Sequence, residues 1–126
     1  MTAKILIVED NPDQRDFLAL LLRQQGYSIA TAIDGLEGIR QVKSTSPDLI
    51  ISDITMPNLD GIEMVKTLRK LPAYRDTPIL MLSAYGTNKL FEALDAGADH
   101  VMRKPLDFDL FSKAIGRLLS QLHEAR

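Results

Sequence analysis

The chain of 126 residues has the length of one globular domain, and two domains of half this size would each lack a sufficient core. It is 45% hydrophobic and 25% charged with a formal net charge of −2, which argues against disorder and against the basic surface of a nucleic-acid-binding protein. No apolar run approaches the roughly 20 residues that cross a bilayer, so we expect no membrane insertion. The absence of cysteine fits a reducing compartment, and we expect a cytoplasmic protein.

Short apolar runs alternate with longer amphipathic stretches along the chain. The runs span residues 4–8, 27–31, 49–52, 78–82 and 101–102. The first, third and fourth are nearly continuous in Val, Ile, Leu and Met, which predicts strands buried on both faces of a parallel sheet. The second and fifth runs are weaker and fit strands at the edges of that sheet.

The stretches between the runs carry five helical patterns. The apolar positions at helical spacing are Phe17, Leu18, Leu21 and Leu22; Leu36, Ile39 and Val42; Ile62, Val65 and Leu68; Leu90, Phe91 and Leu94; and Leu110, Phe111, Ile115, Leu118, Leu119 and Leu122. Asn11 and Pro12 form a helix start, Gly26 and Gly97 follow the first and fourth helices, and Asp107 can cap the fifth. Alternating β and α units predict an α/β fold, with helices on both faces of a parallel sheet.

Side chains able to do chemistry stand at the carboxyl ends of four expected strands. Glu9 and Asp10 follow the first strand, Asp53 the third, Ser83 the fourth and Lys104 the fifth. In open parallel sheets the ligand site lies at this edge. If the first and third strands are neighbours, about 4.8 Å apart, their three carboxylates repel one another unless a cation joins them. A hard divalent ion such as Mg²⁺ suits this set of oxygen ligands.

The charges of this set favour phosphoryl transfer to Asp53. Glu9, Asp10 and Asp53 contribute −3, while a divalent cation and Lys104 contribute +3. An acyl phosphate on Asp53 would leave the site at about −1 with the metal and about −3 without it, so we expect phosphorylation to require the metal. A carboxylate can attack phosphorus without a general base. Lys104, Ser83 and backbone N–H groups after the third strand could then bind the phosphoryl oxygens.

Each of these residues also has an ordinary structural interpretation when it is considered alone. A strand-end aspartate often caps a helix or forms a turn, Glu9 and Asp10 could simply begin a helix, and a lysine is usually a solvated surface residue. The functional interpretation rests on finding all of them at one edge of the expected sheet.

Several motifs, in order and over essentially the whole chain, resemble the receiver domain of bacterial two-component response regulators. They are residues 5–11 (Ile-Leu-Ile-Val-Glu-Asp-Asn), residues 53–57 (Asp-Ile-Thr-Met-Pro) followed by residues 60–61 (Asp-Gly), residues 83–84 (Ser-Ala), residues 97–99 (Gly-Ala-Asp) and residues 104–105 (Lys-Pro). The resemblance implies a flavodoxin-like three-layer sandwich of five helices and a doubly wound five-stranded sheet of order 2-1-3-4-5. It also implies one receiver domain over residues 1–126 with no output domain, as in stand-alone chemotaxis regulators.

The resemblance further implies a role for each residue at the strand ends. Asp53 accepts a phosphoryl group from a phosphohistidine on a sensor histidine kinase or a histidine phosphotransfer protein. Asp10, Asp53 and the backbone carbonyl of Thr55 bind Mg²⁺, for which Mn²⁺ could substitute, and Glu9 acts mainly through metal-bound water. Lys104 pairs with Asp53 or its phosphate.

The family pattern also implies how the signal leaves the site. Ser83 moves to hydrogen-bond the phosphoryl oxygen, and the bond between Lys104 and Pro105 is cis. The protein signals through phosphorylation-dependent contact with a downstream target. It binds no nucleic acid and is not an enzyme beyond its own phosphorylation and dephosphorylation. The helix-four, strand-five and helix-five face is the usual reporting surface, and its apolar candidates are Phe91, Val101, Phe108 and Phe111, of which we expect Phe111 to be in the core.

One position departs from the family pattern. Three residues before Lys104, where the family has an aromatic switch residue, this chain has Val101, preceded by His100. An aromatic ring cannot swing inward here, so we expect either that the loop between the fourth strand and the fourth helix carries the signal or that the domain does not switch by this route. We interpret His100 as a half-exposed strand residue. Thr55 and Tyr85 flank the site, at positions that modulate the access of hydrolytic water in the family.

The loop after Asp53 and two other functions complete the expectations. In this loop Pro57 fixes φ and Gly61 permits a positive φ, so the loop can hold backbone N–H groups against the metal and phosphate. A phosphohydrolase of the haloacid dehalogenase type would also form an aspartyl phosphate, but its nucleophile follows the first strand and has a second Asp two residues later, where this chain has Thr55. An interaction module that ignores phosphorylation is the other alternative, and a receiver that passes its phosphoryl group to another histidine remains open.

Overall fold

The computed structural model describes residues 2–84 and 89–124, with side-chain surroundings up to Gln121. Its sheet contains β1 (Lys4–Val8), β2 (Ser28–Ala32), β3 (Leu49–Asp53), β4 (Ile79–Ser83) and β5 (His100–Arg103). All neighbouring strands pair in parallel, in the order β2-β1-β3-β4-β5. The expected strand order and the two edge strands are therefore confirmed.

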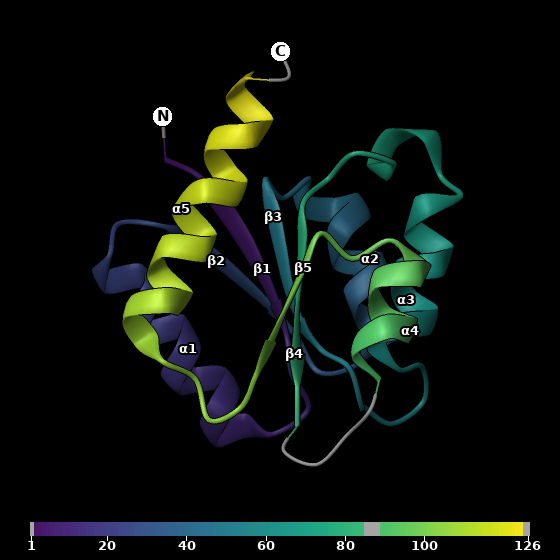
Figure 1. Ribbon diagram of the computed structural model, residues 1–126, viewed down its shortest axis with the longest axis horizontal. Coiled ribbons are helices and arrows are strands. Elements are labelled where there is room, and N and C mark those ends of the chain that lie inside the picture. Colours follow the sequence, from purple (N-terminus) through teal and green to yellow (C-terminus); the bar gives the residue numbers. More distant parts are fainter. Residues whose placement is uncertain (1, 85–88, 125–126) are drawn as a thin grey trace.

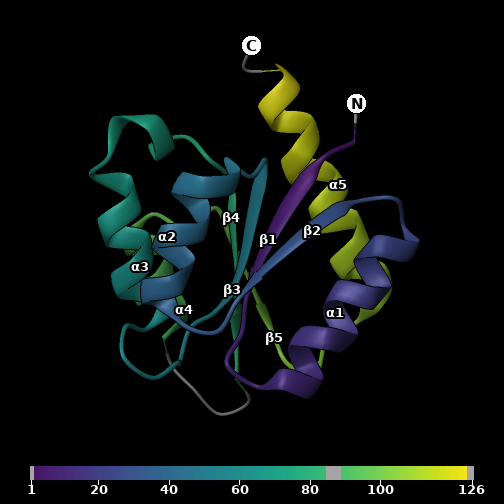
Figure 2. The same ribbon diagram turned by 180° about the vertical axis from the view of Figure 1, so that it is seen from behind.

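Helices cover both faces of the sheet and make three layers. They are α1 (Pro12–Gln24), α2 (Gly35–Thr45), α3 (Gly61–Arg69), α4 (Leu90–Ala96) and α5 (Phe108–Glu124), with a short 3₁₀ turn, η1 (Pro72–Tyr74), before β4. Figure 1 shows α1 and α5 on one face and α2, α3 and α4 on the other, and the view from behind in Figure 2 agrees. This is the doubly wound α/β sandwich expected from the sequence.

The helix boundaries follow from the capping residues expected in the sequence. The Asn11 side chain accepts a hydrogen bond from the backbone N–H of Gln14 at 3.0 Å, and Asp107 caps α5 in the same way through two N–H groups. Gly26 and Gly97, which follow α1 and α4, have φ angles of 99° and 119°. Glycine carries no steric penalty in this conformation, which is why these helices end where they do.

Alternate residues of the central strands supply two hydrophobic cores. Ile5 and Ile7 pack with residues of α1 and α5, among them Phe111, whereas Leu6 and Val8 pack with residues of α2 and α3. Phe111 is fully buried, as expected. Burial on both faces explains why β1, β3 and β4 read as continuous apolar runs.

The helical patterns predict the helices correctly but overstate how much of each stripe is buried. Phe17, Leu36, Phe91 and Leu94 each expose more than two fifths of their surface. In α4 the buried residue is Ala93. A short helix against a flat sheet needs only a narrow contact stripe, so small side chains can fill it.

The loop between β3 and α3 does not use the positive φ that Gly61 permits. The residue with positive φ in this loop is Asn58, at 66°, and Gly61 is not among the residues with positive φ in the described chain. Glycine is needed at Gly61 because a Cβ atom there would lie 2.2 Å from the backbone oxygen of Asp53. Asn58 Nδ2 donates to Asp34 Oδ2 at 2.7 Å and ties the loop to the start of α2.

A second charged cluster lies at the amino edge of the sheet, where β4 and β5 begin. The Arg69 guanidinium donates to the carbonyl oxygens of Gly97, Tyr74 and Thr77 over distances of 2.7–3.0 Å. It also forms an ion pair with Asp99 at 2.9 Å, and Asp99 accepts from the backbone N–H of Ile79. This network joins α3, η1, β4 and the α4–β5 turn.

No helix in the described part of the chain has the length and apolarity that crossing a membrane requires.

Candidate functional site

The parallel pairing of β1 with β3 brings three carboxylates together at the carboxyl edge of the sheet. Val8 is opposite Ser52, so Glu9, Asp10 and Asp53 emerge from neighbouring strand ends. One oxygen from each carboxylate lies within 4.8 Å of the others. Glu9 is buried at 2% exposure, Asp53 is half-buried and Asp10 is exposed, so the cluster opens to solvent on the Asp10 side.

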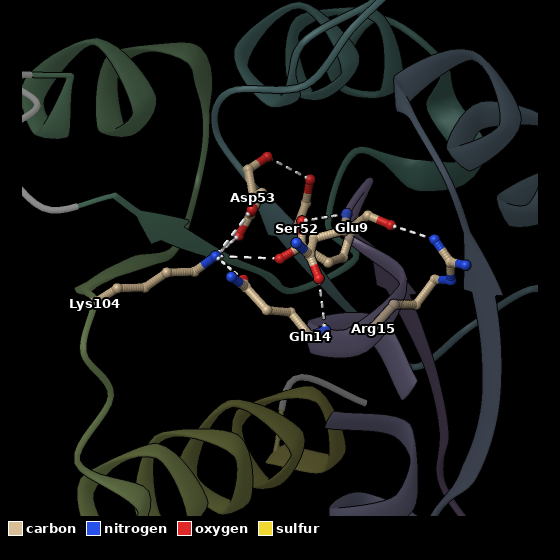
Figure 3. Close-up of polar contacts among 7 residues, drawn as sticks. Glu9, Gln14, Arg15, Ser52, Asp53 and Lys104 are labelled. Atoms are coloured by element: carbon tan, nitrogen blue, oxygen red, sulfur yellow. Dashed lines mark hydrogen bonds and ion pairs between the residues drawn. The ribbon is translucent and has the colours of Figure 1, made fainter. Parts of the chain in front are cut away.

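Lys104 supplies the cation at this site. Its Nζ atom lies 2.8 Å from Asp53 Oδ1, 3.0 Å from Asp53 Oδ2 and 3.1 Å from Glu9 Oε1 (Figure 3). The backbone N–H of Lys104 donates to the carbonyl of Ser83 at 2.9 Å, which fixes the stem of the lysine beside β4. The peptide bond between Lys104 and Pro105 is cis, as expected.

The environment changes the acidity of these groups. Burial, followed by the neighbouring Asp53, raises the pKa of Glu9 above its usual range. Burial, followed by Glu9, also raises the pKa of Asp10. Burial alone would lower the pKa of Lys104, but the hydrogen bond and the charge of Asp53, followed by Glu9, raise it overall. Glu9 and Asp10 are therefore harder to ionise than free carboxyl groups, and a further positive charge nearby would favour their ionised forms.

One buried oxygen of Asp53 has no hydrogen-bond donor among the described residues. Asp53 Oδ1 is buried and, within residues 2–84 and 89–124, accepts no hydrogen bond of acceptable geometry, although the Lys104 ammonium is close. Buried carboxylate oxygens are normally hydrogen-bonded or bound to metal. Together with two further carboxylates within ligand distance, this oxygen fits the requirements of Mg²⁺, which prefers carboxylate oxygens.

Three polar contacts around the cluster were not predicted from the sequence. Gln14 Oε1 accepts a hydrogen bond from Lys104 Nζ at 2.7 Å, Arg15 Nη1 donates to the carbonyl of Glu9 at 3.0 Å, and Ser52 Oγ donates to the carbonyl of Asp53 at 2.8 Å (Figure 3). Gln14 and Arg15 belong to the first turn of α1. Because that helix begins directly after Asp10, its first turn was the place to look for them.

Ser83 and Thr55 occupy the expected edge without joining the cluster through the described hydrogen bonds. Ser83 is buried at the end of β4, and within the described residues its hydroxyl donates to the next carbonyl, that of Ala84, at 3.4 Å. Thr55 is exposed in the β3–α3 loop. The backbone N–H of Ile54, one of the donors expected after β3, bonds to Leu82 at 3.1 Å and so serves the sheet. Tyr85 lies outside the described residues.

The side chains expected to report the signal divide between two surfaces. Phe91 on α4 is 76% exposed, while Val101 is partly buried and packs against the core on that side. Phe108 instead meets Phe17 of α1 in an edge-to-face contact with ring centroids 5.6 Å apart. Phe108 thus lies on the α1 side of the molecule. His100 begins β5 and is half-buried, and burial, followed by the charge of Arg117, lowers its pKa.

Known proteins are similar to this chain in both sequence and fold. Residues 5–116 match the family model of the response regulator receiver domain. The chain is 40% identical over 102 residues to the hybrid signal transduction histidine kinase D of Dictyostelium discoideum, covering 80% of this chain and 6% of that protein. It is 33% identical to the DNA-binding dual master transcriptional regulator RpaA of a Synechocystis strain over 117 residues, covering 92% of this chain and 48% of RpaA.

A solved structure supports the same conclusion. The chemotaxis response regulator CheY4 of Vibrio cholerae superposes with a TM-score of 0.86 at 34% identity, covering 94% of this chain and 99% of that one. The chain spans less than half the length of the curated relatives that it matches. With the family match, the strand order and the strand-end acids in agreement, the chain belongs to the response regulator receiver domains of two-component signalling systems.

Proposed function

We propose that Asp53 is the phosphoacceptor of this receiver domain and takes its phosphoryl group from a phosphohistidine on a sensor histidine kinase or a histidine phosphotransfer protein. The observation that carries the proposal is the convergence of Glu9, Asp10 and Asp53 within 4.8 Å, with the Lys104 ammonium 2.8 Å from Asp53. A lysine beside one carboxylate is an ordinary ion pair. Three carboxylates around one lysine leave a surplus of negative charge, which has no structural purpose of its own.

The reaction needs positioning and neutralisation of charge. A carboxylate oxygen of Asp53 attacks phosphorus, the bond from phosphorus to the donor histidine nitrogen breaks, and its electron pair stays on that nitrogen. Lys104 lies beside both Asp53 oxygens and can stay with the phosphoryl oxygens as they arrive. Ser83 is one residue beyond the partner of Asp53 on β4, and its hydroxyl could donate to the same group after rotating away from Ala84.

We further propose that the domain works with Mg²⁺, with Mn²⁺ as a possible substitute. Asp10, Asp53 and the carbonyl of Thr55 would hold the ion, and Glu9 would act mainly through its water ligands. The buried oxygen of Asp53 and the raised pKa values of Glu9 and Asp10 support this assignment. When bound, the ion would supply positive charge to the phosphoryl oxygens.

Phosphorylation by a small donor tests the phosphoacceptor. We expect the protein, incubated with Mg²⁺ and acetyl phosphate, to gain the mass of one phosphoryl group, and EDTA to prevent the gain. Asp53→Asn should lose the adduct, while Asp76→Asn, an exposed aspartate before β4, should keep it. An unmodified wild-type protein, with a cognate kinase as well as with acetyl phosphate, would contradict the proposal and favour an interaction module that ignores phosphorylation. Turnover of a phosphomonoester would indicate a phosphohydrolase instead.

We also propose that residues 1–126 act as one receiver unit that signals by contact with a target protein. Both cores and the acidic cluster are built within this unit. Phe91 is the candidate contact residue on α4, because it is the most exposed large apolar side chain among the residues whose exposure the structure describes. A target should bind the form with Mg²⁺ and beryllofluoride better than the free form, and Phe91→Ser should reduce this preference more than Leu20→Ser on α1. Equal capture of both forms would contradict signalling by this route.

A further inference from the structure

The Lys104 ammonium has one hydrogen-bond acceptor for each of its protons. A lysine ammonium has three N–H donors. They bond to one oxygen of Asp53 at 3.0 Å, to one oxygen of Glu9 at 3.1 Å and to the amide oxygen of Gln14 at 2.7 Å. The second oxygen of Asp53 lies 2.8 Å from Nζ but accepts no hydrogen bond of acceptable geometry within the described residues. Gln14 therefore makes the shortest of the three hydrogen bonds that hold this ammonium.

The backbone of Gln14 is held in place by the start of α1. Its N–H donates to the Asn11 side chain at 3.0 Å, which is the capping bond of the helix. In the next residue, Arg15 Nη1 donates to the carbonyl of Glu9 at 3.0 Å. The first turn of α1 is thereby tied to the end of β1. Gln14 extends its exposed side chain from this turn toward Lys104 (Figure 3), so the amide starts from a backbone position that these bonds hold.

Gln14 differs from the other acceptors because it is neutral. It occupies one lysine proton without adding a fourth negative charge to the three carboxylates. A lysine is a compact charge on a flexible stem, and each fixed contact reduces the number of positions that its ammonium samples. The side chains of Gln14 and Lys104 also line a groove of about 260 Å³ with Phe17 and Phe108. Without the amide contact, the ammonium would stay near Glu9 and Asp53 but would sample more positions between these carboxylates and the groove.

We propose that Gln14 is a positioning residue for Lys104, and that its amide oxygen sets the rate of phosphoryl transfer to Asp53. The inference rests on the proposed function of Asp53 and adds a residue that positions the lysine beside it. Gln14 acts through the lysine and does not bind phosphate or metal itself. Loss of one such hydrogen bond should slow the transfer by about 3- to 10-fold, because Glu9 and Asp53 still attract the ammonium.

The experiment compares Gln14→Met, which keeps the length of the side chain but removes the acceptor, with Gln24→Met, an exposed position at the other end of α1. The phosphorylation rate with acetyl phosphate is measured by intact mass over a series of Mg²⁺ concentrations. At saturating Mg²⁺ we expect Gln14→Met to be about 3- to 10-fold slower than wild type, with Gln24→Met within about 2-fold. The Mg²⁺ concentration at half-saturation should stay within about 2-fold of wild type in both variants.

The magnesium dependence separates positioning from a general loosening of the site. If Gln14→Met weakens Mg²⁺ binding in proportion to its loss of rate, the residue is structural and the inference is wrong. Equal rates in the two variants would also overturn it. The ¹⁵N signal of the Lys104 ammonium gives a second readout, which should move in Gln14→Met and stay in place in Gln24→Met. A wild-type protein that is never phosphorylated would instead contradict the proposed role of Asp53.

Discussion

Arg69 and Lys104 are both partly buried cations at opposite edges of the same sheet, but their surroundings differ in charge. Arg69 bonds to three neutral carbonyl oxygens and to one carboxylate, that of Asp99. Lys104 lies against Glu9 and Asp53, with Asp10 in the same cluster. The amino-edge network is balanced within the chain, whereas the carboxyl-edge cluster carries a surplus of acids.

This difference separates structure from function in physical terms. A polar network whose donors and acceptors match stabilises the fold and needs nothing from outside. A cluster with surplus charge of one sign destabilises the protein when no ligand is bound, and it favours the binding of an ion of opposite charge. Substitutions at the amino edge should therefore change stability more than activity, and substitutions at the carboxyl edge should change activity more than stability.

Removing the site cation should have the largest effect on activity. In Lys104→Met we expect the rate of phosphorylation by acetyl phosphate with Mg²⁺ to fall by about 100-fold, because the charge beside both Asp53 oxygens is lost. Lys113→Met, an exposed lysine of α5, is the control and should retain the wild-type rate. A decrease below about 3-fold in Lys104→Met would show that this ammonium does not support the transfer.

Removing the balanced cation should reduce stability and leave the chemistry intact. Arg69→Met would strip the partners from three carbonyls and from Asp99, and we expect the free energy of unfolding in urea to fall by about 3 kcal/mol. Arg75→Met, at an exposed neighbouring arginine, should change it by less than about 0.5 kcal/mol. Below its midpoint of unfolding, Arg69→Met should be phosphorylated at the wild-type rate. Loss of phosphorylation in the folded variant would contradict the claim that the Arg69 network stabilises the fold without taking part in phosphorylation.

A satisfied carboxylate should behave like Arg69. Asp34 caps α2 by accepting a hydrogen bond from the N–H of Glu37 at 2.8 Å, and it also accepts one from the Asn58 side chain. Asp60 caps α3 by accepting a hydrogen bond from the N–H of Glu63 at 2.9 Å. We expect Asp34→Ala to cost about 2 kcal/mol and Asp60→Ala about 1 kcal/mol in the free energy of unfolding. The bond from Glu37, followed by that from Asn58, lowers the pKa of Asp34. Its contribution should be complete above the usual carboxyl pKa and disappear as the pH falls through the lowered value. A difference between wild type and Asp34→Ala that persists in strong acid would contradict this account.

For Asp10, in the acidic cluster, ionisation should change stability in the opposite direction to that of Asp34. Burial, followed by Glu9, raises the pKa of Asp10, so in metal-free buffer its ionisation should reduce stability as the pH rises from the usual carboxyl pKa through the raised one. At neutral pH without metal, Asp10→Asn should therefore melt above wild type, by about 2 °C, because Asp10 is exposed and solvent screens its charge. Addition of Mg²⁺ should raise the melting temperature of wild type and leave that of Asp10→Asn unchanged. A lower melting temperature for metal-free Asp10→Asn would indicate that the cluster is not in surplus.

The sequence predicts the fold and the cluster for the same reason. Buried parallel strands must be apolar over their whole length, so Glu9, Asp10 and Asp53 stand out where the strands end, and one edge gathers them. The contacts of Gln14 and Arg15 could not be predicted in this way. Both are ordinary polar residues of a helix, and their contacts depend on how α1 is placed relative to β1.

Positions where several side chains can satisfy one requirement were also poorly predicted. The loop after Asp53 needs a residue of positive φ, and this is Asn58, which also bonds to Asp34, while Gly61 is required for close backbone approach. The stripe of α4 looks like a core pattern, yet Phe91 is exposed because Ala93 fills the contact with the rest of the molecule. Local spacing predicts a helix but does not determine which side of a broad stripe is buried.

A crystal structure of the protein with Mg²⁺ and beryllofluoride tests the central claim most directly. We expect one ion bound by Asp10, Asp53 and the carbonyl of Thr55, beryllofluoride on an oxygen of Asp53, and the Lys104 ammonium in contact with a fluorine atom. An ion bound elsewhere, or a structure in which Asp53 keeps only its contacts with Lys104, would contradict the assignment of the acidic cluster as the phosphorylation site.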